Sequence, residues 1–94
     1  MNNRVLGMVY QWQTLLFESR YSNTTPGRKT DFPKLIEAFG GHGYSANTME
    51  EFKVAYQDAL KQEGPSWIDC HISREDLVLP MIHNGKTVDD IIYE

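Results

Sequence analysis

The chain has 94 residues, enough for one small domain, and its 40% hydrophobic and 23% charged residues are ordinary for a globular protein. Its net charge of −4, with scattered basic residues, argues against nucleic acid as a partner, and its apolar stretches are too short to span a membrane. The single cysteine, Cys70, excludes an internal disulfide and fits a reducing compartment, so we expect a cytoplasmic location.

The first predicted element is a helix over residues 5–19. Its apolar residues recur at spacings of three and four and should form one buried face: Val5, Met8, Val9, Trp12, Leu15 and Leu16. Residues 20–30 have no such period and are rich in Ser, Thr, Asn, Pro and Gly. This pattern predicts a long exposed loop, and loops of this length often serve as lids or binding elements.

A second helix is predicted over residues 32–39, with Asp31 or Thr30 as its cap and Gly40-Gly41 as its end. Its buried residues should be Phe32, Leu35, Ile36 and Phe39. The next residues, 42–46, have the composition of a short strand.

Residues 48–63 carry the pattern of a third helix, in which Thr48 and Glu51 form a capping box and Gly64-Pro65 follows the end. The inward residues are predicted to be Phe52, Ala55, Tyr56, Ala59 and Leu60. A strand over 66–72 should then place Ile68, Cys70 and Ile72 on one side and Trp67, Asp69 and His71 on the other. The tail, residues 73–94, contains a turn, an extended run broken by Pro80 and a short terminal helix.

The order of these elements predicts an α/β fold. Helices that alternate with strands are typical of a parallel sheet covered on both faces. Because only two strands can be identified, we expect a partial three-layer parallel sheet flanked by helices.

Two kinds of site find little support. His42, His71 and His83 fall in separate elements without the spacing of metal ligands. Cys70 alternates with isoleucines, which favours a buried core residue over a nucleophile.

Ordered blocks along the chain resemble the C-terminal end of the acetolactate synthase (acetohydroxyacid synthase) catalytic subunits, which depend on thiamine diphosphate. The blocks are "NN–LGMV–QWQ–LF–RYS", "DFPKLIEAFG–HG", "GPSWIDCHI" and "VLPMI–NG". The resemblance covers essentially all of residues 1–94, and it implies the C-terminal portion of a thiamine-diphosphate-binding domain.

The resemblance implies a magnesium and cofactor site near the start of the chain. The side-chain oxygen of Asn3 and the backbone carbonyl of Val5 would coordinate Mg²⁺, which prefers hard oxygen ligands. The segment that wraps the diphosphate and cofactor would comprise Asn3, Arg4, Val5, Leu6, Gly7 and Met8. The Gly-Asp-Gly motif that supplies the remaining protein ligands in this family is absent from the sequence. Without the resemblance, the same residues would suggest only a loop that caps a helix.

The resemblance also implies a substrate channel. Trp12 would line it, select the larger second keto acid and contact inhibitors, with Met8 and Asn84 nearby. Arg20, Tyr21 and Ser22 would belong to a mobile segment that closes over the active site. From the residues alone, Met8 and Trp12 would be core residues, Asn84 a turn residue and the loop a flexible linker.

The implied reaction is the decarboxylating condensation of two pyruvates, or of pyruvate and 2-ketobutyrate, in branched-chain amino-acid biosynthesis. The implied partners are the remainder of the catalytic subunit, a second catalytic subunit and a regulatory small subunit, with FAD bound elsewhere in the full-length enzyme. The "QWQ" motif favours the biosynthetic branch of the family. We expect these 94 residues alone to be inactive. Two alternatives stay open: another thiamine-diphosphate-dependent carboligase or 2-keto acid decarboxylase, and a non-catalytic interaction module derived from one.

Overall fold

The computed structural model describes residues 1–27 and 29–94; Arg28, which belongs to the predicted loop, lies outside the described residues. The elements in chain order are α1 (Gly7–Leu16), α2 (Phe32–Ala38), β1 (His42–Ala46), α3 (Met49–Ala59), β2 (Ser66–Cys70) and the 3-10 helix η1 (Val88–Asp90). Every predicted helix and strand is therefore present, although α1, α2, α3 and β2 are shorter than predicted and the terminal helix is a 3-10 helix. None of the described helices combines the length and the apolar character that crossing a bilayer requires.

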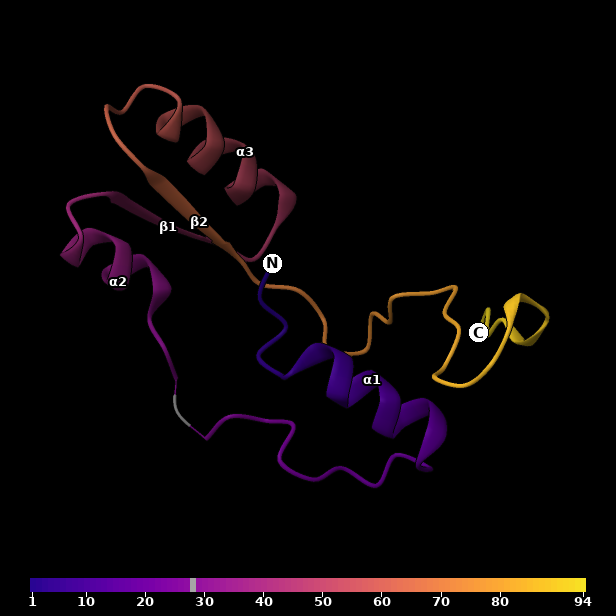
Figure 1. The fold of residues 1–94 in the computed structure, drawn as a ribbon. Coiled ribbons are helices and arrows are strands. Elements are labelled where there is room, and N and C mark those ends of the chain that lie inside the picture. Colours follow the sequence, from indigo (N-terminus) through magenta and orange to yellow (C-terminus); the bar gives the residue numbers. More distant parts are fainter. Residues whose placement is uncertain (28) are drawn as a thin grey trace.

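The two strands form a parallel pair joined through α3. Their register runs from His42 opposite Ser66 to Ala46 opposite Cys70. On the other side of β2, the start of the chain adds one more parallel pairing, between Asn2 and His71. The Asn2 N–H donates to the Cys70 carbonyl at 2.7 Å, so the N-terminus lies beside the end of β2 (Figure 1). Three parallel segments thus lie side by side, with β2 in the middle.

Helices cover both faces of this sheet, as Figure 1 shows with α2 on one side and α3 on the other. On the α2 side the Phe32 ring stacks on Trp67 with the ring centroids 5.8 Å apart. On the α3 side the Tyr44 hydroxyl donates to Asp58 at 2.8 Å. A side chain at Gly43 would overlap the Pro33 carbonyl group, so glycine is needed where α2 meets β1. The predicted three-layer α/β arrangement is confirmed.

The helix ends follow local signals. Asp31 caps α2 by accepting from the Lys34 N–H at 3.1 Å, and this N–H together with the Lys34 ammonium lowers the Asp31 pKa. Thr48 likewise caps α3. The expected capping box is wrong in one detail, because Glu51 accepts from the backbone N–H of Asn47, at 2.7 Å, rather than from that of Thr48. Hydrogen bonds from Asn47 lower the Glu51 pKa.

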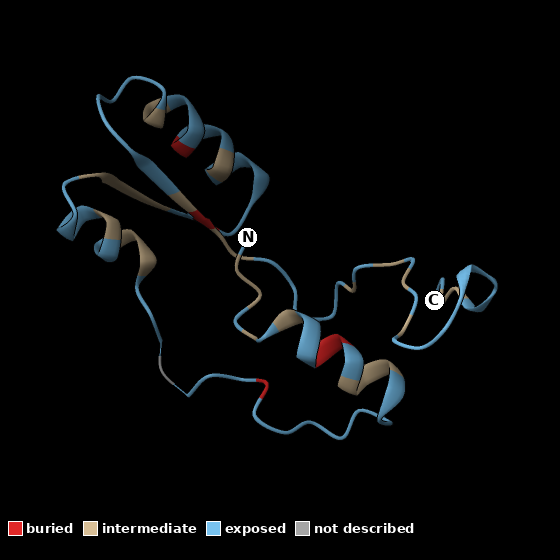
Figure 2. Cartoon of the chain, viewed as in Figure 1, coloured by how far each residue is buried: buried red, intermediate tan, exposed pale blue. Residues whose placement is uncertain are grey.

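The buried core is smaller than the apolar patterns predict. Within the described residues only Tyr10, Ala46 and Ala55 are buried hydrophobics (Figure 2). The predicted inward residues Phe39, Tyr56 and Leu60 are 80%, 50% and 69% exposed. The radius of gyration is 17.0 Å, whereas a compact chain of this length would have about 12 Å. No other described segment covers these apolar side chains of α2 and α3, so this part of each helix surface is open.

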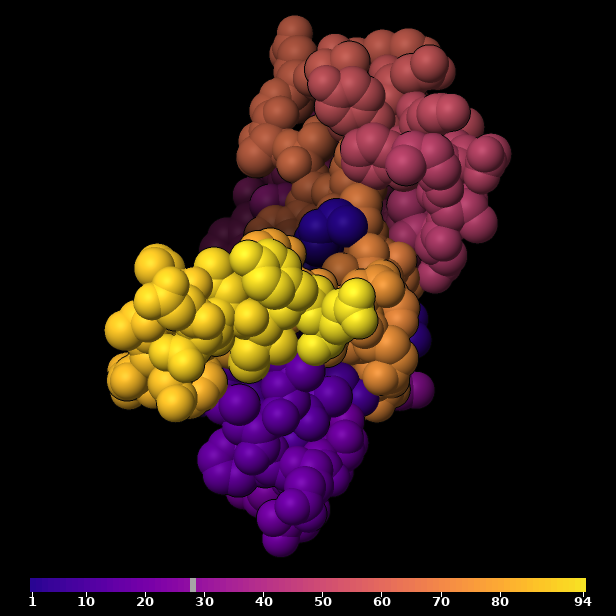
Figure 3. Space-filling model, turned by 90° about the vertical axis from the view of Figure 1, so that its right-hand side faces the viewer, coloured from indigo at the N-terminus to yellow at the C-terminus, as the bar shows by residue number. Residues whose placement is uncertain are grey.

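The helix α1 differs most from its prediction. Its apolar face is largely open, with Met8, Val9, Trp12 and Leu16 exposed. Its buried residues are instead Tyr10 and Gln11. The neighbours of α1 are irregular segments rather than the sheet, and the space-filling view shows the tail lying directly against it (Figure 3).

Candidate functional site

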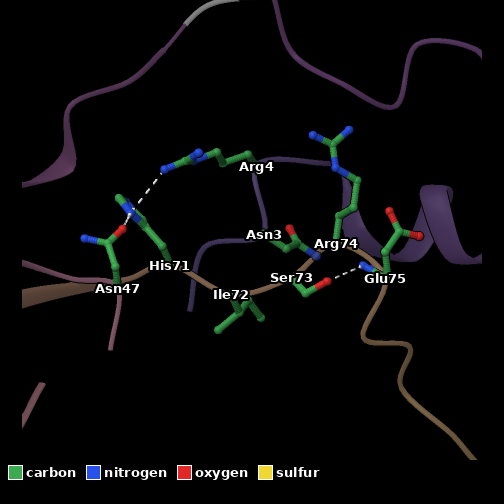
Figure 4. Close-up of a pocket in the computed structure, with 8 residues that line it drawn as sticks. All are labelled: Asn3, Arg4, Asn47, His71, Ile72, Ser73, Arg74 and Glu75. Atoms are coloured by element: carbon green, nitrogen blue, oxygen red, sulfur yellow. Dashed lines mark hydrogen bonds between the residues drawn. The ribbon is translucent and has the colours of Figure 1, made fainter. Parts of the chain in front are cut away.

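A hollow of about 370 Å³ lies where the three parallel segments end (Figure 4). Its walls come from the turn after Asn2, from the residue after β1 and from the chain after β2: Asn3, Arg4, Asn47, His71, Ile72, Ser73, Arg74 and Glu75. In open α/β sheets, ligands bind outside the carboxyl ends of the strands. The fold therefore brings residues distant in sequence to the edge at which ligands bind in such folds.

A tight turn carries the chain from this edge into α1. The Asn2 side-chain oxygen accepts from the Arg4 N–H at 3.0 Å, and the Asn3 side-chain oxygen accepts from the Val5 N–H at 3.3 Å. Arg4 has a φ of 60°, a left-handed conformation that costs a non-glycine residue about 1 kcal/mol or more. The paired asparagines thus stabilise a strained turn, and the Asn3 oxygen keeps acceptor capacity because an amide oxygen has two lone pairs.

Asp69 fixes this turn to the sheet. It is 6% exposed, and its Oδ2 accepts from the Asn2 Nδ2 at 3.1 Å. The same oxygen lies 3.1 Å from the His71 Nε2. A buried carboxylate requires such partners. Asp69 therefore links the start of the chain to the end of β2.

His71 connects three groups around the hollow. A neutral ring protonated on Nε2 donates to Asp69 and accepts at Nδ1 from the Arg4 Nη2, which lies 3.1 Å away. A doubly protonated ring donates from Nδ1 to the Asn47 Oδ1, 2.7 Å away, as well as to Asp69. Arg4 and Asn47 thus lie beside the same ring nitrogen of His71, and whether this nitrogen carries a hydrogen decides which of the two it bonds.

The N-terminus of α1 is open toward the same edge. Leu6 stands at the cap position and supplies no side-chain hydrogen bond, in contrast to Asp31 of α2 and Thr48 of α3. Within residues 1–27 and 29–94, the N–H groups of Gly7, Met8 and Val9 in the first turn have no acceptor. A Cβ on Gly7 would lie 3.1 Å from the Asn3 Nδ2, so glycine leaves room for the Asn3 side chain.

The structure brings together the residues predicted to bind cofactor. Asn3 and Arg4 line the hollow, Val5 and Leu6 link it to α1, and Gly7 and Met8 begin the helix. In the described part of the chain, no three His, Cys, Asp or Glu side chains gather closely enough to hold a metal ion. Any divalent ion here would depend on neutral oxygens of this chain and on ligands from elsewhere.

The predicted channel residues lie apart from the hollow. Trp12 is 39% exposed on the open face of α1, next to Met8 at 58%. Asn84 is exposed in the turn before η1, and its carbonyl lies 3.2 Å from the His83 Nδ1. No hydrogen bond joins Asn84 to α1 among the residues that the structure describes.

Tyr10 contacts both the loop that follows α1 and the chain that follows β2. The Tyr21 ring stacks on Tyr10 with the ring centroids 4.5 Å apart, and its hydroxyl lies 3.1 Å from the Thr14 hydroxyl. The Tyr10 hydroxyl donates to the Glu75 carboxylate at 3.2 Å. Hydrogen bonding with Tyr21, burial and the Glu75 charge raise the pKa of Tyr10 to about 12. Tyr10 thus stays protonated and remains a donor throughout the physiological range.

Sequence reasoning missed Asn47, Asp69 and His71 as members of the site. Their signal was available, since Asp69 and His71 are polar residues at the end of a strand that helices should cover on both faces. The alternation placed them correctly on one side of β2, but it did not indicate that Asn2 would pair with this strand.

Comparison with known proteins identifies the family. Residues 1–70 match the model of the thiamine pyrophosphate enzyme C-terminal TPP-binding domain. The chain is 37% identical over 89 residues to the acetolactate synthase large subunit of Porphyra purpurea, which covers 93% of this chain and 15% of that protein. It is 36% identical over 92 residues to the mitochondrial acetolactate synthase catalytic subunit of Saccharomyces cerevisiae, covering 98% of this chain and 13% of the relative. It is 34% identical over 92 residues to the acetolactate synthase isozyme 2 large subunit of Escherichia coli, covering 98% and 17%.

The chain thus spans about one seventh of the length of these relatives. The family match and the parallel strands with an open helix N-terminus at their carboxyl edge agree with each other. The chain belongs to the thiamine pyrophosphate enzymes, as part of their C-terminal TPP-binding domain.

Proposed function

We propose that residues 1–94 form the C-terminal part of the cofactor-binding domain of an acetolactate synthase catalytic subunit. The enzyme would condense two pyruvates, or pyruvate and 2-ketobutyrate, with decarboxylation, in cytoplasmic branched-chain amino-acid synthesis. The names of relatives 34–37% identical over nearly the whole chain support this assignment. The observation that carries it is the uncapped N-terminus of α1 beside Asn3 at the carboxyl edge of the sheet.

The donor set fits Mg²⁺ in part. The side-chain oxygen of Asn3 and the carbonyl of Val5 are neutral hard oxygens, the kind of ligand that Mg²⁺ accepts alongside phosphate and water. Two such oxygens cannot complete an octahedral shell, so the remaining ligands would come from the diphosphate, from water and from the remainder of the catalytic subunit. In this arrangement the Asn2–Asp69 bond would hold the turn in place while Asn3 faces the ion.

The diphosphate would bind at the start of α1. The unpaired first-turn N–H groups and the positive end of the helix dipole favour an anion there. Arg4 and Arg74 line the adjoining hollow and add positive charge. When bound, thiamine diphosphate supplies the nucleophilic carbon and the electron sink that decarboxylation of a 2-keto acid requires.

The open apolar face of α1 would meet substrate. Trp12 would form a flat wall of the channel and distinguish the ethyl group of 2-ketobutyrate from the methyl group of pyruvate. Met8, one turn earlier on the same face, would contact cofactor and substrate together. Asn84 would approach the same channel from the tail, and the loop 20–30 would close over it and exclude water.

The remaining open surfaces would meet the rest of the enzyme. The exposed apolar residues of α1, α2 and α3 would pack against the remainder of the catalytic subunit and a second catalytic subunit, with a regulatory small subunit as a further partner. FAD would bind outside these 94 residues.

A hybrid subunit tests this function. In the Escherichia coli isozyme 2 large subunit, residues 1–94 of this chain replace the segment that they match. We expect the hybrid subunit to form acetolactate from pyruvate when thiamine diphosphate, Mg²⁺ and FAD are present, and the 94-residue chain alone to form none. A folded hybrid subunit without activity would contradict the proposal.

A further inference from the structure

The sequence "QWQ" places Trp12 between two glutamines for which the proposed function has no role. Gln11 is 3% exposed, more buried than any hydrophobic residue of α1. A buried amide is costly unless both its donor and its acceptor are satisfied. The partners of the two glutamines therefore indicate what they do.

Gln11 pairs with the backbone of the tail. Its Nε2 donates to the Val78 carbonyl at 2.9 Å, and its Oε1 accepts from the Val78 N–H at 2.7 Å. The same Nε2 lies 3.0 Å from the Met81 sulfur. One side chain thus satisfies both backbone groups of a tail residue 67 positions later in the sequence.

Gln13 makes the same pair of hydrogen bonds to the loop that follows α1. Its Nε2 donates to the Ser22 carbonyl at 3.1 Å, and its Oε1 accepts from the Ser22 N–H at 2.7 Å. The Leu6 N–H donates to the Thr24 carbonyl at 2.8 Å, which attaches the next part of the loop to the start of the helix. The beginning of the loop is therefore held along the length of α1.

The two pairings lie on different sides of the helix. Successive residues of a helix are about 100° apart around its axis, so Trp12 lies about 100° from Gln11 and about 100° from Gln13. Gln11 and Gln13 therefore point in nearly opposite directions, with Trp12 between them. In Figure 1 the loop and the tail accordingly lie on opposite sides of α1. Trp12 remains 39% exposed between them.

We propose that Gln11 and Gln13 are positioning residues that fasten the tail and the loop to opposite sides of α1 and so set the two walls beside Trp12. The attachment itself stands on the four hydrogen bonds. Its consequence for keto-acid binding rests on the proposed function, in which Trp12 lines the substrate channel.

An amide is the side chain that this role needs. It presents one donor and one acceptor with nearly the spacing of a peptide group, so it can pair with both the N–H and the carbonyl of one residue. Methionine has a similar length and shape but neither group. The same substitution at neighbouring positions, Gln11→Met and Gln13→Met, therefore gives a matched pair of variants.

Hydrogen exchange tests whether the glutamines hold the tail and the loop. It is measured on the 94-residue chain and on the hybrid subunit, because a variant that fails to fold in one can still be measured in the other. Gln11→Met should speed exchange of the Val78 amide about tenfold and leave the Ser22 amide unchanged, and Gln13→Met should do the reverse. Gln57→Met, at an exposed position of α3, is the control and should change neither. Equal effects of both substitutions on both amides, or no effect of either, would overturn the proposal.

Kinetics of the hybrid subunit test the consequence separately. Each substitution should raise KM for pyruvate about tenfold and change kcat less than threefold, because it displaces a channel wall and leaves the cofactor segment intact. If each substitution speeds exchange only of its own partner amide but leaves KM unchanged, the attachment stands and its proposed effect on the substrate channel is refuted. An inactive hybrid subunit with normal exchange would instead refute the proposed function alone.

Discussion

Replacing Asp69 with alanine would remove the group that fixes the Asn2–Arg4 turn to the sheet. Asp69 is 6% exposed, and its Oδ2 serves both the Asn2 Nδ2 and the His71 Nε2, each at 3.1 Å. Hydrogen bonds to a charged group contribute about 1.5–3 kcal/mol, and the substitution also leaves the half-buried amide of Asn2 without its acceptor. Because His71 is partly exposed and can rebind water, we expect a total cost of about 2–3 kcal/mol.

This cost should appear as weaker Mg²⁺ binding, since the proposed ligand Asn3 follows directly on the released turn. A loss of about 2–3 kcal/mol corresponds to roughly a 30- to 150-fold weaker apparent affinity. The assay is the Mg²⁺ concentration that gives half-maximal activity of the hybrid subunit at saturating thiamine diphosphate. Asp69→Asn, which retains one acceptor oxygen, should fall between alanine and the unsubstituted protein.

The matched control is Asp76→Ala, an exposed carboxylate in the tail that is not among the residues lining the hollow. Its effect should stay within about 0.5 kcal/mol. If the alanine variants at positions 69 and 76 differ by less than threefold in Mg²⁺ dependence, the reasoning about this turn is wrong.

Three further predictions concern single residues. Gly43→Ala should destabilise the chain by about 1–3 kcal/mol in thermal unfolding, because the new methyl group overlaps the Pro33 carbonyl. The control, Gly27→Ala, has open space around it and should change stability little. Equal effects of the two substitutions would refute this packing. Glu51 has a folded pKa below its ordinary value of 4.5, so its stabilising contribution is present above that pH and is lost as the pH falls. Glu51→Gln should therefore unfold more readily than the native chain at pH 7 and match it near pH 2, as followed by circular dichroism, and a constant difference across this range would contradict the assignment. Trp12→Leu in the hybrid subunit should reduce the preference for 2-ketobutyrate over pyruvate about tenfold in a competition assay, and an unchanged product ratio would remove Trp12 from the channel.

Local signals predicted the elements well because short-range chemistry determines them. Asp31 and Thr48 cap the predicted helices, Gly40 with a φ of 83° follows the end of α2, and the strand over residues 42–46 has the predicted bounds. These features depend on hydrogen bonds between residues a few positions apart, which a sequence pattern can reveal.

The buried faces were predicted less well because they depend on distant partners. The periodicity of α1 identifies an apolar face but not what covers it, and in this chain Trp12 and Leu16 stay exposed while Gln11 is buried. Gln11 is buried because Val78 pairs with it, a contact that no local period encodes.

In the candidate site, too, local features could be predicted and contacts between distant residues could not. The resemblance predicted a cofactor site at residues 3–8, and the fold places these residues at the carboxyl edge of the sheet. Asp69 joins the site only because Asn2 pairs with β2 across 67 positions in the sequence. Predicting this contact requires the order of the strands in the sheet. Two identifiable strands and one residue of a third do not determine that order.

The most direct test is a crystal structure of the hybrid subunit with thiamine diphosphate and Mg²⁺. We predict that the ion lies about 2.1 Å from the Asn3 side-chain oxygen and from the Val5 carbonyl, with a phosphate group at the first-turn N–H groups of α1. An ion coordinated without Asn3, or a diphosphate bound away from the start of α1, would contradict the assignment of this edge as the cofactor site.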